Sequence, residues 1–114
     1  MEIPIYKTEI PYFFNMEFDS KEYIFEIDYN LLFNHFTVSL KYNGEYLVTG
    51  EKVILNQPLF SFATDEDGNR ATNFPNVDIV PFTNDTKVSR VGYNELGDSV
   101  ILKIEEVVNN EGRG

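Results

Sequence analysis

Apolar side chains recur at every second position through much of the sequence, and no other feature restricts the possible folds as strongly. The clearest run is 36–42, and similar runs occupy 12–18, 23–29 and 100–105. Successive side chains of a β-strand point to opposite faces of the sheet, so this period predicts strands with one face on a hydrophobic core. No stretch of ten or more residues has the 3.6-residue period of a helix. The chain is therefore predicted to be all-β.

Turn-forming residues separate these runs. The polar residues 19–21 are expected to join the first two runs as a hairpin. Asn43-Gly44 predicts a type I′ turn, because Asn and Gly tolerate the positive φ that both central residues of that turn need. The return strand is expected to end at Gly50, which marks a bulge or a corner, with a further short strand over 52–55.

A loop and two more strands complete the predicted architecture. The alternation fails over 56–75, which is predicted to be a long loop. A short strand follows from Val77 and is expected to end at Pro81, which has no N–H for a ladder hydrogen bond. Together with the last strand this makes about seven or eight strands, and we predict a small antiparallel β-sandwich or barrel. Residues 1–108 are expected to form a single domain and residues 109–114 a flexible tail.

Composition excludes several classes of partner. The 10 Phe and 7 Tyr favour pleated, half-buried surfaces. Nineteen acidic residues against nine basic ones give a net charge of -10, which repels phosphate backbones and anionic lipid headgroups. No run approaches the roughly 20 apolar residues of a membrane span, and the first residues lack the features of a signal peptide. We expect neither a nucleic acid nor a membrane as partner.

Side chains with catalytic chemistry are few or unpatterned. The chain has no cysteine, and its one histidine, His35, falls on the polar face of a predicted strand. None of the serines lies in a Gly-x-Ser-x-Gly elbow, and the spacing of the carboxylates selects no pair for glycoside hydrolysis. The glycines form no phosphate-binding loop. We predict no enzyme activity, no catalytic residue and no cofactor.

The acidic stretch 65–69 matches part of a calcium-binding loop. Its glycine stands at the wrong position for that loop, so no metal ligands are predicted. A weak, opportunistic cation site at Asp65 and Asp67 is kept only as a hypothesis.

A set of strand and turn residues spans nearly the whole chain and matches a known family in order and spacing. The set comprises Ile3-Pro4-Ile5, Asn15-Met16-Glu17-Phe18, Tyr23-x-Phe25-x-Ile27-x-Tyr29-Asn30, the strand from Phe36 to Tyr42 with Asn43-Gly44, Val48-Thr49-Gly50, and Tyr93-Asn94-Glu95-Leu96-Gly97-Asp98-x-Val100. In this the chain resembles the small baseplate plug proteins of contractile-tailed bacteriophages. The segment 56–75 is longer and more acidic than that family leads us to expect, so no contacts are transferred there.

The resemblance implies a structural component of a phage tail baseplate. Such a protein plugs or joins the central hub and tube by protein–protein contacts, so the implied partners are hub, spike and tube proteins. The implied location is the virion, with the host cytoplasm before assembly. A homo-oligomer in the assembled particle is compatible with the sequence.

Two apolar segments are candidate partner contacts. The N-terminal segment has no hairpin partner in the sequence pattern, and Pro4 limits its own ladder, so it is expected to add to the sheet of a neighbouring protein. The second segment is the aromatic-bearing loop 56–75. The residues predicted to contact partners are Ile3, Ile5, Tyr6, Leu59, Phe60, Phe62 and Phe74.

A second function is open on the sequence alone. The chain could be a carbohydrate- or ligand-binding β module, such as a receptor-recognition domain on a tail. In that case Phe60, Phe62 and Phe74 would form the binding rim of the long loop.

Overall fold

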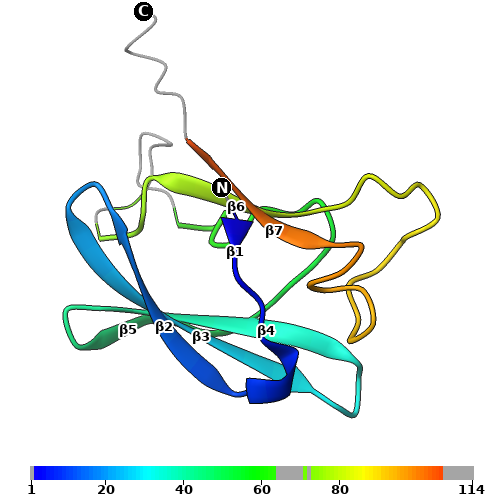
Figure 1. Cartoon of the computed structure of the whole chain (residues 1–114). Helices are drawn as coiled ribbons and strands as arrows, with labels where there is room; N and C mark the ends of the chain where they lie inside the picture. The colour runs from blue at the N-terminus through cyan, green and yellow to red at the C-terminus, as the bar shows by residue number, and fades with distance from the viewer. Residues whose placement is uncertain (1, 64–70, 72, 107–114) are drawn as a thin grey trace, which may run out of the picture.

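Two antiparallel sheets face each other in the computed structural model, which describes residues 2–63, 71 and 73–106 (Figure 1). The larger sheet has the strand order β2 (Tyr12–Phe18), β3 (Lys21–Asn30), β4 (His35–Tyr42) and β5 (Glu45–Lys52). The smaller sheet has the order β1 (Glu2–Ile3), β7 (Ile101–Glu106) and β6 (Val77–Phe82). This confirms the predicted all-β architecture as a sandwich, with seven strands in the described part of the chain.

A single turn of 3-10 helix, η1 (Lys7–Glu9), links β1 of the small sheet to β2 of the large one. No helix among the described residues has the length and apolar character needed to cross a bilayer.

The hairpins of the large sheet form where the sequence predicts them. Asp19 and Ser20 join β2 to β3, and Asn43 and Gly44 join β4 to β5. All four residues have positive φ, between 54° and 85°, as a two-residue type I′ turn requires. Because β2, β3 and β4 then pair in an unbroken register, the inward-facing residues of all three strands come to lie on one face.

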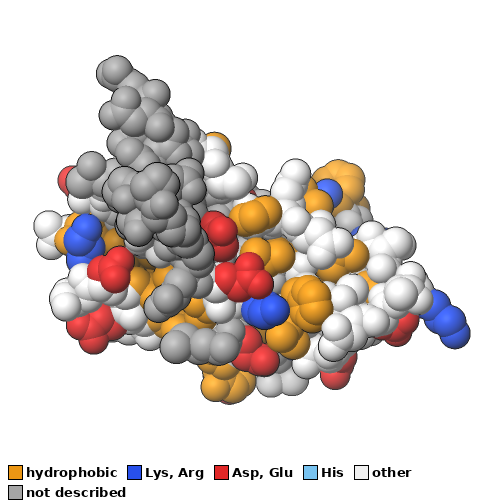
Figure 2. Space-filling model, turned by 90° about the horizontal axis from the view of Figure 1, so that it is seen from above, with side chains coloured by type: hydrophobic (Ala, Val, Ile, Leu, Met, Phe, Trp, Pro, Cys, Tyr) orange, Lys and Arg blue, Asp and Glu red, His pale blue; other side chains and the backbone are white. Residues whose placement is uncertain are grey.

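That face supplies most of the hydrophobic core. Phe25, Phe36 and Leu40 are completely buried, and their immediate neighbours in sequence are more exposed. The small sheet covers them with Ile79 and Leu102. Seen from above the small sheet, the outer surface instead carries apolar patches between acidic and basic side chains (Figure 2). The period of two therefore separates core from surface as predicted.

Strand β5 differs from its prediction. It continues through Gly50 to Lys52, so the expected end at Gly50 and the separate strand over 52–55 are wrong. The expected bulge is confirmed, because the register of β5 against β4 shifts between the partners of Val38 and Leu40, and Gly50 has a φ of +68°. A bulge places an extra residue in one strand without ending the pairing.

Strand β6 also runs one residue further than predicted, through Pro81 to Phe82. The carbonyl oxygen of Pro81 accepts a hydrogen bond from the Asn56 amide at 2.8 Å. The N–H and C=O positions of a strand residue point the same way, so the nitrogen of Pro81 faces away from β7 and the ladder loses no bond. Proline is tolerated here because β6 is an edge strand.

The start of the predicted long loop covers this edge. The amide of Leu59 donates to the Ile79 carbonyl at 2.9 Å, beside the bond from Asn56 to Pro81. None of the described residues of 56–75 belongs to a strand, in agreement with a loop. Residues 64–70 and 72, with Asp65 and Asp67 of the hypothetical cation site, lie outside the described residues, as does the tail over 109–114.

Candidate functional site

Three consecutive apolar side chains project from the turn between β3 and β4. Leu31, Leu32 and Phe33 are 82%, 81% and 66% exposed, and we call them the apolar tip. The turn holds four residues because Asn30 pairs with His35 across the hairpin. The side chain of Asn30 accepts a hydrogen bond from the Phe33 amide at 3.0 Å, which shapes the turn.

The base of the apolar tip is fixed to the rest of the protein through Asn34. Its side-chain oxygen accepts hydrogen bonds from the Tyr29 hydroxyl and from the Tyr93 amide, the latter at 3.0 Å. Its carbonyl accepts a bond from the Arg90 guanidinium at 2.8 Å. Gly92 permits this approach, since a Cβ there would lie 2.7 Å from Asn34 Nδ2. The tip is thus an exposed apolar surface on a well-anchored turn.

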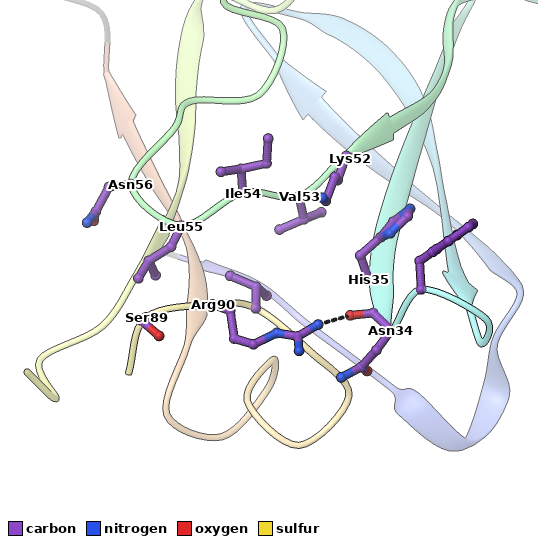
Figure 3. A pocket seen from close by; sticks show the side chains of 11 residues that line it. Asn34, His35, Lys52, Val53, Ile54, Leu55, Asn56, Ser89 and Arg90 are labelled. Carbon is purple, nitrogen blue, oxygen red and sulfur yellow. Dashed lines mark hydrogen bonds between the residues drawn. The ribbon is translucent and has the colours of Figure 1, made fainter. Parts of the chain in front are cut away.

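A pocket of about 390 Å³ lies directly beside the apolar tip (Figure 3). Its wall is made by the start of β4, the end of β5 with the chain that follows, and residues 89–91. Phe33 belongs to both the tip and the pocket wall. Lys52, Arg90 and His35 line the pocket, and none of its lining residues in the described part of the chain is acidic.

The sequence analysis overlooked the apolar tip. The tip lies between two alternating runs, and each run already supplies its own buried face. The three further apolar residues between these runs therefore have no place in the core. A short connection between strands is normally polar, and an exposed apolar run is an error in design unless it has a function. That contrast is the signal that could have identified Leu31, Leu32 and Phe33.

Of the residues predicted to contact partners, three belong to the core. Ile3, Leu59 and Phe60 are each only 1% exposed. The N-terminal segment does have a partner within the chain, because β1 pairs with β7, with Ile3 opposite Leu102. The sequence could not reveal this pairing, which joins residues about 100 positions apart.

The other predicted contacts are more accessible. Tyr6 is 49% and Phe62 is 62% exposed, whereas Ile5 and Phe74 are half-buried and pack against the core. Phe62 and Phe74 meet edge to face with ring centroids 5.9 Å apart. Because Phe60 lies in the core, Phe62 and Phe74 are the two residues of the predicted ligand-binding rim that remain accessible.

Groups that could support metal chemistry are not gathered in the described part of the chain, where no cluster of three or more His, Cys, Asp or Glu side chains occurs. His35 stacks on Phe33, with ring centroids 6.4 Å apart, at the edge of the pocket.

Comparison with protein families decides the identity. Residues 1–107 match the family model described as cyanophage baseplate Pam3 plug gp18. The chain belongs to this baseplate plug family. A search of curated proteins finds no match.

Membership confirms the resemblance noted in the sequence and makes the chain a structural component of a phage tail baseplate. The family is named for a structural role and not for a reaction. A baseplate plug works by contact with other baseplate proteins, so the surfaces that matter are those able to bind protein. The apolar tip is the most exposed apolar surface among the described residues.

A partly buried carboxylate holds the loop segment that contains Phe60. Glu51 Oε2 accepts a hydrogen bond from the Phe60 amide at 2.8 Å, and Glu51 Oε1 is buried without a hydrogen-bond partner among the residues that the structure describes. Phe60 has a φ of +63°, which is strained for a residue with a side chain. Burial raises the pKa of Glu51 above its ordinary 4.5, and the Phe60 amide only partly opposes this.

This carboxylate makes stability depend on pH in a defined direction. Between pH 4.5 and the raised pKa of Glu51, the unfolded chain ionises this group and the folded chain does not, so the folded state loses stability as pH rises. Glu51→Gln, which keeps an acceptor for the Phe60 amide, should therefore gain stability relative to the parent from pH 4 to pH 7. Urea unfolding of both proteins at the two pH values measures this, and an unchanged difference would contradict it.

Proposed function

We propose that this protein joins the central hub of the baseplate to the tail tube and that the apolar tip is the main contact. It would reach the virion by assembly from the cytoplasm of the infected host. The observation that carries the proposal is the exposure of Leu31, Leu32 and Phe33 on an anchored turn.

The energetics favour a partner for this surface. Full burial of a Leu or Phe side chain contributes about 1.5–3 kcal/mol, so three such residues can supply much of the energy of an interface. Apolar surface of this kind, rimmed by polar residues such as Asn30 and Asn34, is typical of protein interaction sites. Because hydrogen bonds fix the turn, little backbone conformational entropy is lost when the tip binds.

The test replaces all three tip residues by serine, L31S/L32S/F33S. Since these side chains are exposed, the variant should keep the parent's melting temperature within a few degrees. Its affinity for co-expressed hub and tube proteins should fall by at least about 100-fold, measured by co-purification and titration. Tyr46→Ser is the matched control, because Tyr46 is exposed on β5 near the far end of the same sheet.

Two results would contradict the proposal. One is full co-purification of the triple variant with hub and tube. The other is an oligomer of the isolated parent chain, seen by sedimentation, that the triple variant no longer forms. That second result would assign the apolar tip to contacts between copies of this chain.

A further inference from the structure

We propose that the pocket beside the apolar tip binds an acidic side chain of a peptide segment from a neighbouring baseplate protein, with an apolar residue next to it. This proposal rests on the proposed function for the kind of partner, but it concerns a separate surface with a different chemistry.

The charge of the pocket is opposite to that of the chain. The protein has nineteen acidic and nine basic residues, and on the face seen in Figure 2 the two signs are interspersed. The described part of the pocket wall has Lys52, Arg90 and His35 and no Asp or Glu. A basic hollow in so acidic a protein is an electrostatic complement for a negatively charged ligand.

The basic groups are available for a ligand. Among the residues that the structure describes, neither Lys52 nor Arg90 forms an ion pair. Arg90 donates to the Asn34 carbonyl, which orients its guanidinium and leaves its other N–H donors for a carboxylate (Figure 3).

The size and rim of the pocket indicate a side chain with an apolar neighbour. About 390 Å³ is enough for a few side chains and too small for a folded element. Phe33 and Ile54 are both exposed and both line the pocket, so they offer apolar contact next to the charges. An acidic residue followed by an apolar one satisfies both features.

The test measures binding of a fluorescein-labelled peptide that contains three glutamates alternating with leucines. Its affinity for the purified full-length chain is followed by fluorescence anisotropy at physiological salt. The double variant K52Q/R90Q should weaken binding by at least about ten-fold, because charge-assisted hydrogen bonds are lost. A peptide with glutamine in place of each glutamate should bind the parent chain as weakly as the glutamate peptide binds K52Q/R90Q.

The matched control is K21Q/K87Q, which makes the same change in net charge outside the pocket. It should retain the parent's affinity. Equal loss in both double variants, equal binding of the glutamine peptide, or no binding of the glutamate peptide at millimolar concentration would overturn the proposal. The readouts are separable from those of the apolar tip: if the peptide does not bind while L31S/L32S/F33S still loses hub and tube, only the pocket proposal fails.

Discussion

Phe25→Ala is expected to lower the free energy of unfolding by about 3–5 kcal/mol, a large share of the stability of a domain this size. The Phe25 side chain is completely buried at the centre of the large sheet. Its ring stacks on Phe14 at 5.3 Å between centroids, and the rings of Phe18 and Phe60 lie 6.3 and 6.4 Å away. Alanine would leave a cavity that three other aromatic rings line, and rings on a paired sheet cannot collapse fully into it.

Urea unfolding monitored by tyrosine fluorescence or circular dichroism measures this loss. Phe13→Ala is the matched control, because Phe13 lies on β2 next to Phe14 but faces outward and is 59% exposed. It should change stability by no more than about 0.5 kcal/mol. Similar losses in the two variants would mean that the faces of the large sheet are assigned incorrectly.

Ile3→Ala is expected to lower the free energy of unfolding by about 2–4 kcal/mol, although Ile3 is only the third residue of the sequence. Its side chain is in the core, and β1 forms one edge of the small sheet through its pairing with β7. Glu2→Ala is the control, since Glu2 belongs to the same strand and is exposed. It should leave stability within about 0.5 kcal/mol of the parent.

This experiment separates two roles for the N-terminal segment. If β1 is part of the fold, Ile3→Ala lowers the urea midpoint of the isolated protein. If the segment instead binds a neighbouring protein, the variant would keep the parent's midpoint and lose affinity for hub or tube. The second outcome would contradict the pairing of Ile3 with Leu102.

In the two proposals, the apolar tip and the pocket beside it form one composite contact at the end of the β3–β4 hairpin. The tip offers apolar area, and the pocket beside it offers directional, charged hydrogen bonds. Apolar area contributes most to affinity, whereas charged groups contribute most to specificity and orientation.

Three of the four sheet edges have features that limit unintended pairing, and the fourth edge is β2. The outer edge of β6 is covered by the chain from Asn56 to Leu59. The edge strand β5 is interrupted by bulges, and β1 is only two residues long. Such features limit strand addition by other proteins at these three edges.

Much of the large sheet follows from local sequence alone. The alternation within 12–18, 23–29 and 36–42 assigns the residues of these runs to the core or the surface, because strand geometry has a period of two. Asn43-Gly44 determines its own turn, because few residue pairs adopt two successive positive φ values. The order and spacing of strand and turn residues also sufficed to indicate the baseplate plug family.

The tertiary structure alone decided which apolar segments are buried. Ile3, Leu59 and Phe60 all looked available in sequence. Ile3 pairs with β7 and the Leu59 amide donates to β6, both far along the chain. The Phe60 amide donates to Glu51, and its ring packs near Phe25 in the core. The apolar tip is exposed because the core is already filled by the runs on either side of it. The pocket joins residues from three separate segments, 33–35, 52–56 and 89–91, and no local pattern can bring these together. Local periodicity determines the face of a strand, whereas burial depends on what the rest of the chain places against that face.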